Sequence, residues 1–106
     1  MNKVIIYHVS LDPIRSGCIE RQLKIMRLFC ENQGWEIVNE YVDLSRNSDK
    51  QENLQTILNT PMNANILLIK NAYFLSRNTV SFIKIKKQLE NKGMRIYSLA
   101  DGEEWL

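Results

Sequence analysis

Four short apolar segments, separated by stretches with helical spacing, constrain the fold of this chain more than any other feature. The segments are Lys3–Val9, Trp35–Val42, Asn65–Lys70 and Met94–Leu99. Their β-branched content or their alternation of apolar and polar residues is typical of strands. Strands that alternate with helices form β-α-β units with parallel strands and helices on both faces. We therefore predict a flavodoxin-like, three-layer α/β domain with a mainly parallel four-stranded sheet in the order 2-1-3-4.

The intervening segments carry apolar residues at helical spacing. These residues are Ile19, Leu23, Met26 and Cys30 in the first segment, Leu54, Ile57 and Leu58 in the second, and Val80, Ile83 and Leu89 in the third. Gly34 and Gly93 stand where the first and third helices should end. Ser48 and Gln51 form a capping box ahead of the second helix. The tail, residues 100–106, predicts no clear element.

Length and composition favour a single cytoplasmic domain. The chain has 106 residues, of which 44% are hydrophobic and 25% charged, as in ordinary soluble domains. No apolar run reaches the roughly 18 residues that a membrane span needs, and no cleavage site for a signal peptide follows Met1. The net charge of +2 is small for a dedicated DNA-binding domain, so we expect weak, non-specific DNA binding at most.

The cysteine and histidine content predicts neither a disulfide nor a metal site. Cys18 and Cys30 fall on one predicted helix, roughly 18 Å apart at 1.5 Å per residue, so they cannot pair. They are expected to be free thiols in a reducing compartment. A single histidine and two distant cysteines offer no set of metal ligands, and we expect no cofactor.

The expected topology also selects a site. In open α/β sheets, ligands bind beyond the carboxyl ends of the strands, where the strand order reverses. Here that rule points to the loops Ser10–Ser16 and Asn71–Asn78, with Asp43 close by at the end of the second strand. From spacing alone, however, Ser10 is more often an ordinary turn serine than a nucleophile, and Asp43 is as often a residue that only ends a strand.

A family pattern runs through these same segments. Its pieces, in chain order, are Tyr7–Ser10, Arg21–Leu23, Trp35–Asp43, Ile66–Lys70 with Leu75–Thr79, and Gly93–Leu99. Together they resemble the catalytic domain of serine recombinases, the resolvases and invertases. The resemblance implies that Ser10 occupies the position of a nucleophile that attacks a DNA phosphodiester without a metal. It also implies site roles for Arg77, Asp43 and His8.

The departures from that pattern concern its positive charges. His8 stands where the family has an arginine, Gln51-Glu52 where it has Arg-Pro, and Tyr73-Phe74 where it has Asp-Arg. Arg77 is the arginine of the last motif that remains. Arg15 and Arg46 lie in neighbouring loops and are candidate substitutes. The chain also ends at Leu106, before the helix that dimerises the family and before any DNA-reading domain.

The position of His8 relative to Ser10 depends on where the first strand ends. A histidine at this position is more often a packed strand residue than a catalytic one. If the strand continues past Val9, we expect His8 to point to the opposite face of the pleat from Ser10.

Three hypotheses follow for the function. The leading one is a recombinase-like accessory or regulatory domain that does not cleave DNA, with a full-length recombinase or a second copy of itself as partner. The alternative is an active site-specific recombinase with Ser10 as nucleophile. The third is a flavodoxin-like binder of phosphate or flavin at residues 10–17, which lacks the dense Thr/Ser/Gly pattern of such loops.

Overall fold

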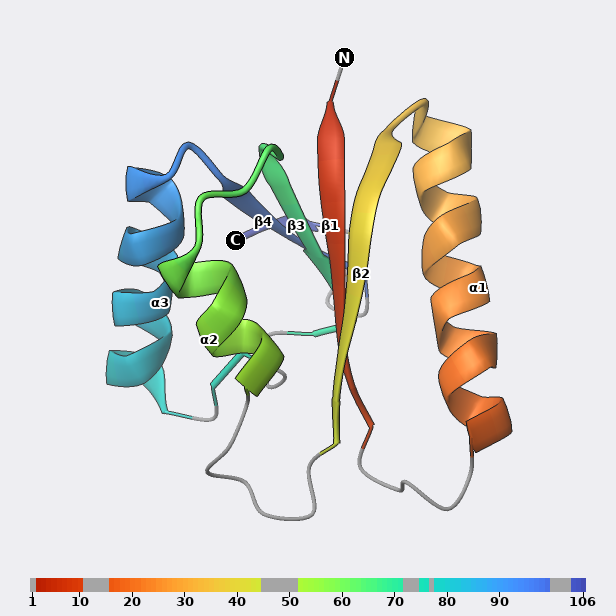
Figure 1. The fold of residues 1–106 in the computed structure, drawn as a ribbon, viewed down its shortest axis with the longest axis horizontal. Coiled ribbons are helices and arrows are strands. Elements are labelled where there is room, and N and C mark those ends of the chain that lie inside the picture. Colours follow the sequence, from red (N-terminus) through yellow and green to blue (C-terminus); the bar gives the residue numbers. More distant parts are fainter. Residues whose placement is uncertain (1, 11–15, 45–51, 72–74, 77, 100–103) are drawn as a thin grey trace.

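The computed structural model shows a single five-stranded sheet covered by three helices (Figure 1), and it describes residues 2–10, 16–44, 52–71, 75, 76, 78–99 and 104–106. The strands lie in the order β2-β1-β3-β4-β5. Their bounds are β1 Lys3–Ser10, β2 Glu36–Leu44, β3 Ile66–Ile69, β4 Arg95–Ser98 and β5 Glu104–Trp105. The helices are α1 Ser16–Gln33, α2 Glu52–Asn59 and α3 Thr79–Asn91.

The first four strands are parallel, as the sequence predicts. β1 pairs with β2 on one side and with β3 on the other, and β3 pairs with β4. The predicted order 2-1-3-4 and the flavodoxin-like α/β class are therefore confirmed. All four carboxyl ends lie at the same edge of the sheet, which is the lower edge in Figure 1.

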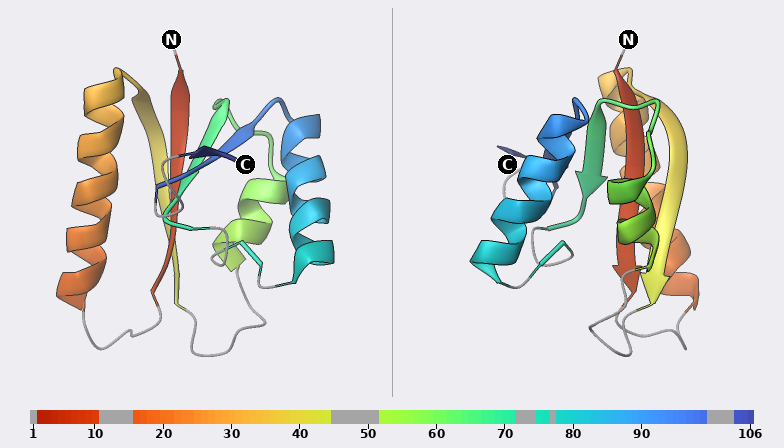
Figure 2. Two further views of the ribbon diagram at one scale, coloured as in Figure 1. Left: turned by 180° about the vertical axis from the view of Figure 1, so that it is seen from behind. Right: turned by 60° about the vertical axis from the view of Figure 1, so that its left-hand side comes forward.

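The two faces of the sheet are covered unequally. α1 lies alone on one face, and α2 and α3 lie together on the other (Figures 1 and 2). Alternate residues of β1 pack against the helix layers on the two faces of the sheet. Val4 and Ile6 pack in the cluster that includes Leu23 and Met26 of α1, whereas the odd-numbered residues of β1 pack in the cluster with α2 and α3. This alternation decides on which face each site residue of β1 lies.

The tail forms an element that the sequence did not predict. β5 pairs antiparallel with β4, with Tyr97 opposite Trp105, so the sheet has one more strand than expected. The rings of these two residues meet edge to face with their centroids 4.8 Å apart, and the Arg95 guanidinium lies 4.2 Å from the centre of the Trp105 ring. Trp35 also reaches the Trp105 ring, at 5.9 Å. Aromatic contacts therefore hold a strand too short to leave a periodic signal.

Both expected glycine ends are confirmed. Gly34 and Gly93 have φ angles of 73° and 76°, in the left-handed region that glycine adopts without strain. At the end of α3, Gly93 N–H donates to the Glu90 carbonyl and Met94 N–H to the Leu89 carbonyl, each at 2.9 Å. This pair of bonds is the Schellman motif.

Gly93→Ala should therefore destabilise the protein through backbone strain alone. No atom lies within 4 Å of an added Cβ at this position, so steric clash does not contribute. We expect a loss of about 1 kcal/mol in the free energy of unfolding, measured by urea denaturation. Asn91→Ala, an exposed change in the last turn of α3, is the control, and equal stability of the two variants would contradict the prediction.

Cys30 is a buried free thiol, and burial raises its pKa to about 11. The side chain of Cys18 lies outside the described part of the chain. Within the ranges that the structure describes, none of the helices has the length and apolar character needed to cross a bilayer.

Candidate functional site

Buried polar side chains gather near one edge of the sheet. Among the described residues, the buried polar or charged ones are His8 and Ser10 on β1, Asp43 on β2 and Ser98 on β4. All four lie in the carboxyl-terminal part of their strands. Burying a polar group costs free energy unless a partner compensates it, so such a concentration in an otherwise apolar interior marks this edge as the candidate site.

Asp43 is held by three hydrogen bonds. The Tyr7 hydroxyl donates to Oδ2 at 2.7 Å. The backbone N–H of Asn53 donates to Oδ1 at 3.0 Å, and that of Leu54 to Oδ2 at 3.2 Å. These two N–H groups belong to the first turn of α2, where no helical carbonyl is available to them. Asp43 therefore caps α2 from the neighbouring strand, while the capping box expected at Ser48 and Gln51 lies outside the described residues.

Ser10 on β1 and Asp43 on β2 are close in the strand register, but their side chains lie on different faces of the sheet. In the β1–β2 register, Val9 is opposite Asp43 and Ser10 is opposite Leu44. Since side chains alternate along a strand, Ser10 belongs to the α1 face. Asp43 belongs to the α2 face, where Tyr7 contacts it. The sheet thus lies between the hydroxyl of Ser10 and the Asp43 carboxylate.

His8 lies on the same face as Ser10, so the expectation that the two would point apart is wrong. β1 runs without a break through Ser10. Residues two positions apart on one strand share a face, whether or not the strand continues past Val9. His8 is opposite Val42, which packs in the cluster with α1. The imidazole and the Ser10 hydroxyl therefore belong to the same side of the sheet.

Burial and a neighbouring lysine determine the charge of His8. Its side chain is buried, and this burial lowers its pKa below the ordinary 6.5, with the positive charge of Lys70 as a second cause in the same direction. His8 is therefore neutral at pH 7. Lys70 follows β3 directly.

The lowered pKa of His8 predicts a loss of stability in mild acid. The unfolded chain binds a proton at His8 near pH 6.5, before the folded protein does. The free energy of unfolding should therefore fall as the pH drops below about 6.5, and level off for this group below its folded pKa. Urea denaturation between pH 7.5 and 5 measures the effect. His8→Asn should flatten this part of the profile, and an unchanged slope in that variant would contradict the prediction.

Arg77, Arg15 and Arg46 lie outside the described residues, as do Gln51 and the Tyr73-Phe74 pair. The expected convergence of Ser10, Asp43 and Arg77 can therefore be followed for Ser10 and Asp43 alone. These two residues lie on adjacent strands, and their side chains face opposite helix layers.

Sequence reasoning missed three residues of this edge, namely Tyr7, Lys70 and Ser98. Tyr7 bonds Asp43, Lys70 acts on His8, and the Ser98 hydroxyl donates to the Lys70 carbonyl at 3.3 Å. A signal for Lys70 was present, since it ends the third strand, directly before a loop that the crevice rule selects. Tyr7 looked like an ordinary core residue of an apolar strand.

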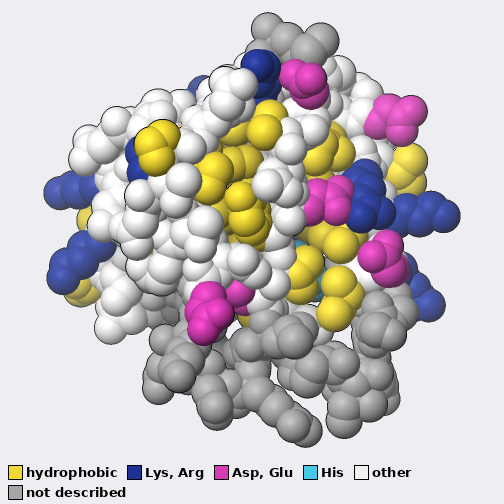
Figure 3. Space-filling view, viewed as in Figure 1, with side chains coloured by type: hydrophobic (Ala, Val, Ile, Leu, Met, Phe, Trp, Pro, Cys, Tyr) yellow, Lys and Arg dark blue, Asp and Glu magenta, His cyan; other side chains and the backbone are white. Residues whose placement is uncertain are grey.

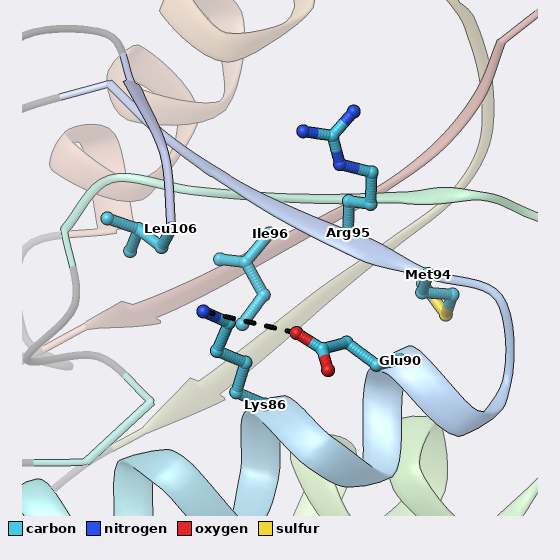
Figure 4. A pocket seen from close by; sticks show the side chains of 6 residues that line it. All are labelled: Lys86, Glu90, Met94, Arg95, Ile96 and Leu106. Carbon is cyan, nitrogen blue, oxygen red and sulfur yellow. Dashed lines mark ion pairs between the residues drawn. The ribbon is translucent and has the colours of Figure 1, made fainter.

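A separate cavity of about 250 Å³ lies at the other end of β4. It is lined by Lys86 and Glu90 of α3 together with Arg95 and Leu106 (Figure 4). The Lys86 Nζ and Glu90 Oε1 atoms form an ion pair at 3.9 Å. Because Arg95 begins β4, this cavity lies away from the carboxyl edge that holds Ser10. No set of three or more metal-ligating side chains occurs among the residues that the structure describes.

Comparisons with known proteins agree with the fold and the motif pattern. The family model "Resolvase, N terminal domain" matches residues 4–105. A resolvase family site-specific recombinase from Streptococcus pneumoniae is similar in structure, with a TM-score of 0.77 and 19% identity over 96% of this chain and 74% of that one. None of the curated proteins matches.

Two further solved structures are similar. The catalytic domain of the IS607-like serine recombinase ISC1926 TnpA has a TM-score of 0.79 and 18% identity, covering 91% of this chain and 68% of that one. The N-terminal catalytic domain of TP901-1 integrase has a TM-score of 0.72 and 22% identity, covering 94% and 78% of the two chains. At these identities the structural likeness speaks for the fold alone.

Proposed function

This chain belongs to the serine recombinase family, through its resolvase N-terminal domain, and from that premise we propose that it is a non-catalytic member with an accessory or regulatory role in DNA recombination. The observation that carries the proposal is the neutral, buried His8 at the position where the family has an arginine. Its partner would be a full-length recombinase or a second copy of this chain.

The chemistry explains why that exchange matters. In the family reaction the serine Oγ bonds to the phosphorus of a DNA phosphodiester, and the bond to the 3′ oxygen breaks. The negative charge of this transition state requires positive groups already in place, and loss of one such donor typically costs about 10²–10³ in rate. Arginine suits this task because it offers paired donors and stays charged. A neutral imidazole offers at most one N–H donor.

The position of Asp43 supports the same proposal. Its two carboxylate oxygens accept bonds from Tyr7 and from the first turn of α2. These bonds point to a role in holding α2 against the sheet. A carboxylate on the α2 face is also poorly placed to act on Ser10, which belongs to the α1 face.

One observation favours the alternative of an active recombinase. His8 and Ser10 share a face of the sheet, and a neutral imidazole has a nitrogen that can accept a proton. His8 is thus a candidate general base for the Ser10 hydroxyl. Cleavage by this route would still need positive charge for the phosphate oxygens.

Trapping on DNA tests the proposal. The protein is incubated with supercoiled DNA and with a nicked suicide substrate, and denaturing gels are searched for a covalent protein–DNA adduct. We expect none, against a full-length serine recombinase that forms one under the same conditions. An adduct that disappears in Ser10→Ala would overturn the proposal and establish the active enzyme.

A further inference from the structure

We infer that the outward face of α1 is a docking surface for a second copy of this chain, with the two α1 helices packed antiparallel. The inference rests on the proposed function in one respect, since it specifies the second copy that is named there as a partner. Five exposed residues at helical spacing form this face, namely Arg21, Lys24, Ile25, Leu28 and Glu31.

The outward face is separate from the core. Leu23, Met26 and Cys30 of α1 are buried and pack against the sheet, and α1 is the outermost element on its side of the molecule (Figures 1 and 2). Ile25 and Leu28 are nevertheless 50% and 51% exposed. A single exposed leucine is ordinary, but residues three positions apart on a helix are neighbours, so these two form one apolar strip.

Charged residues flank this strip at both ends. Arg27 is already paired with Glu40 and Glu20, whereas Lys24 and Glu31 belong to none of the ion pairs among the described residues. Seven residues separate Lys24 from Glu31, which is about 10 Å along the helix axis, too far for the two to pair with each other. Both charges are therefore available to an outside partner.

The order of these charges fits an antiparallel second copy. With Ile25 of each copy opposite Leu28 of the other, Lys24 of one copy lies within two residues, or about 3 Å along the axis, of the level of Glu31 of the second copy. The two-fold symmetry repeats this contact at the other end. Parallel helices in register would instead place Lys24 opposite Lys24 and Glu31 opposite Glu31. Charge complementarity thus selects the antiparallel arrangement.

The size of the face sets the expected affinity. One helix face in contact with another buries less than the roughly 1,200 Å² at which stable complexes begin. We therefore expect a weak dimer with a Kd of about 0.1 mM. Since salt screens charges at a surface, the dimer should weaken as the ionic strength rises. Sedimentation velocity of the full chain, over a concentration series at low salt, measures the Kd.

Reversal of one charge tests the two inter-copy pairs. Lys24→Glu brings two glutamates together at each end of the contact, and Glu31→Lys brings two lysines together. Each variant alone should dimerise about tenfold more weakly than the wild type, because two attractive contacts become repulsive. Lys84→Glu makes the same change at an exposed position of α3 and should leave the Kd unchanged.

Mixing the two variants gives the sharper test. In a mixed dimer, the new glutamate at position 24 meets the new lysine at position 31, and the unchanged Lys24 meets the unchanged Glu31. An equimolar mixture of Lys24→Glu and Glu31→Lys should therefore dimerise about as well as the wild type. Effects within a single helix would not be repaired by mixing.

The apolar strip is tested separately. Leu28→Asn should weaken the dimer about tenfold, through the loss of buried apolar surface. Val80→Asn makes the same kind of change at an apolar residue of α3 that is 62% exposed, and it should have no effect.

The outcomes separate this inference from the proposed function. A wild type that stays monomeric at about 1 mM, a Lys24→Glu variant with an unchanged Kd, or a mixture that dimerises no better than its components would each overturn the inference and leave the non-catalytic proposal intact. A covalent DNA adduct at Ser10 would instead overturn the proposed function, whatever the state of association.

Discussion

Replacing Asp43 with alanine should destabilise the protein by about 3 kcal/mol, as judged from the loss of a helix cap and of a buried hydrogen bond. The carboxylate is buried and accepts from Tyr7, Asn53 and Leu54. Without it, two N–H groups of α2 and one buried hydroxyl lose their acceptor. For a domain of this size, such a loss corresponds to a fall of roughly 12–24 °C in the melting temperature.

Three further variants divide the effect. Tyr7→Phe removes the hydroxyl alone and should cost about 1 kcal/mol. Because both residues share one hydrogen bond, the double variant should cost less than the sum of the single ones. Asp43→Asn keeps an acceptor oxygen for α2 and should lie between Asp43→Ala and the wild type. Urea denaturation measures the free energy of unfolding of the wild type and of all four variants, Asp43→Ala included.

An Asp43→Ala variant as stable as the wild type would contradict this prediction. The bonds from Asp43 to α2 would then contribute nothing to the stability of the fold. The carboxylate would then again be a candidate for chemistry at Ser10.

Most of the fold follows from local patterns along the chain. The four parallel strands stand out because each is a short apolar run between helical stretches, and Gly34 and Gly93 end their helices through a φ that other residues avoid. β5 could not be predicted this way. Its two residues are held by the rings of Tyr97 and Trp35, contacts between segments far apart in the sequence.

The candidate site, like the fold, could be predicted from the sequence only in part. The crevice rule locates the correct edge of the sheet, because it depends on strand order. It does not say on which face each side chain lies, and that depends on the register of β1 against β2. Asp43 therefore looked like a partner of Ser10, whereas its bonds go to Tyr7 and α2.

β2 is an edge strand of the sheet, and a contact with α1, which is distant in the sequence, places charges on it. The Arg27 guanidinium of α1 forms a two-pronged pair with Glu40, with bonds of 2.6 and 2.7 Å. Figure 3 shows basic and acidic side chains in contact beside β2, on the α1 side of the molecule. The pair places charges on the edge strand, which is one way in which proteins discourage edge-to-edge pairing.

Restoring the family's arginine at position 8 should cost the protein about 3 kcal/mol or more, the scale of a buried charge without a partner. His8 is only 5% exposed and feels the charge of Lys70. A guanidinium at this position stays charged, so it cannot escape the cost by losing a proton as the imidazole does. We expect His8→Arg to unfold at clearly lower urea concentration than the wild type.

Two controls identify the cause. Ser81→Arg adds the same side chain at an exposed position of α3 and should change stability by less than about 0.5 kcal/mol. Adding Lys70→Gln to His8→Arg removes the repulsion between two cations and should recover about 1 kcal/mol. A His8→Arg protein as stable as the wild type would show that the edge accepts a second cation. The expected loss instead means that, among the described residues, a neutral side chain at position 8 and the cation of Lys70 belong together. A single ammonium group offers no paired donors to a transition state.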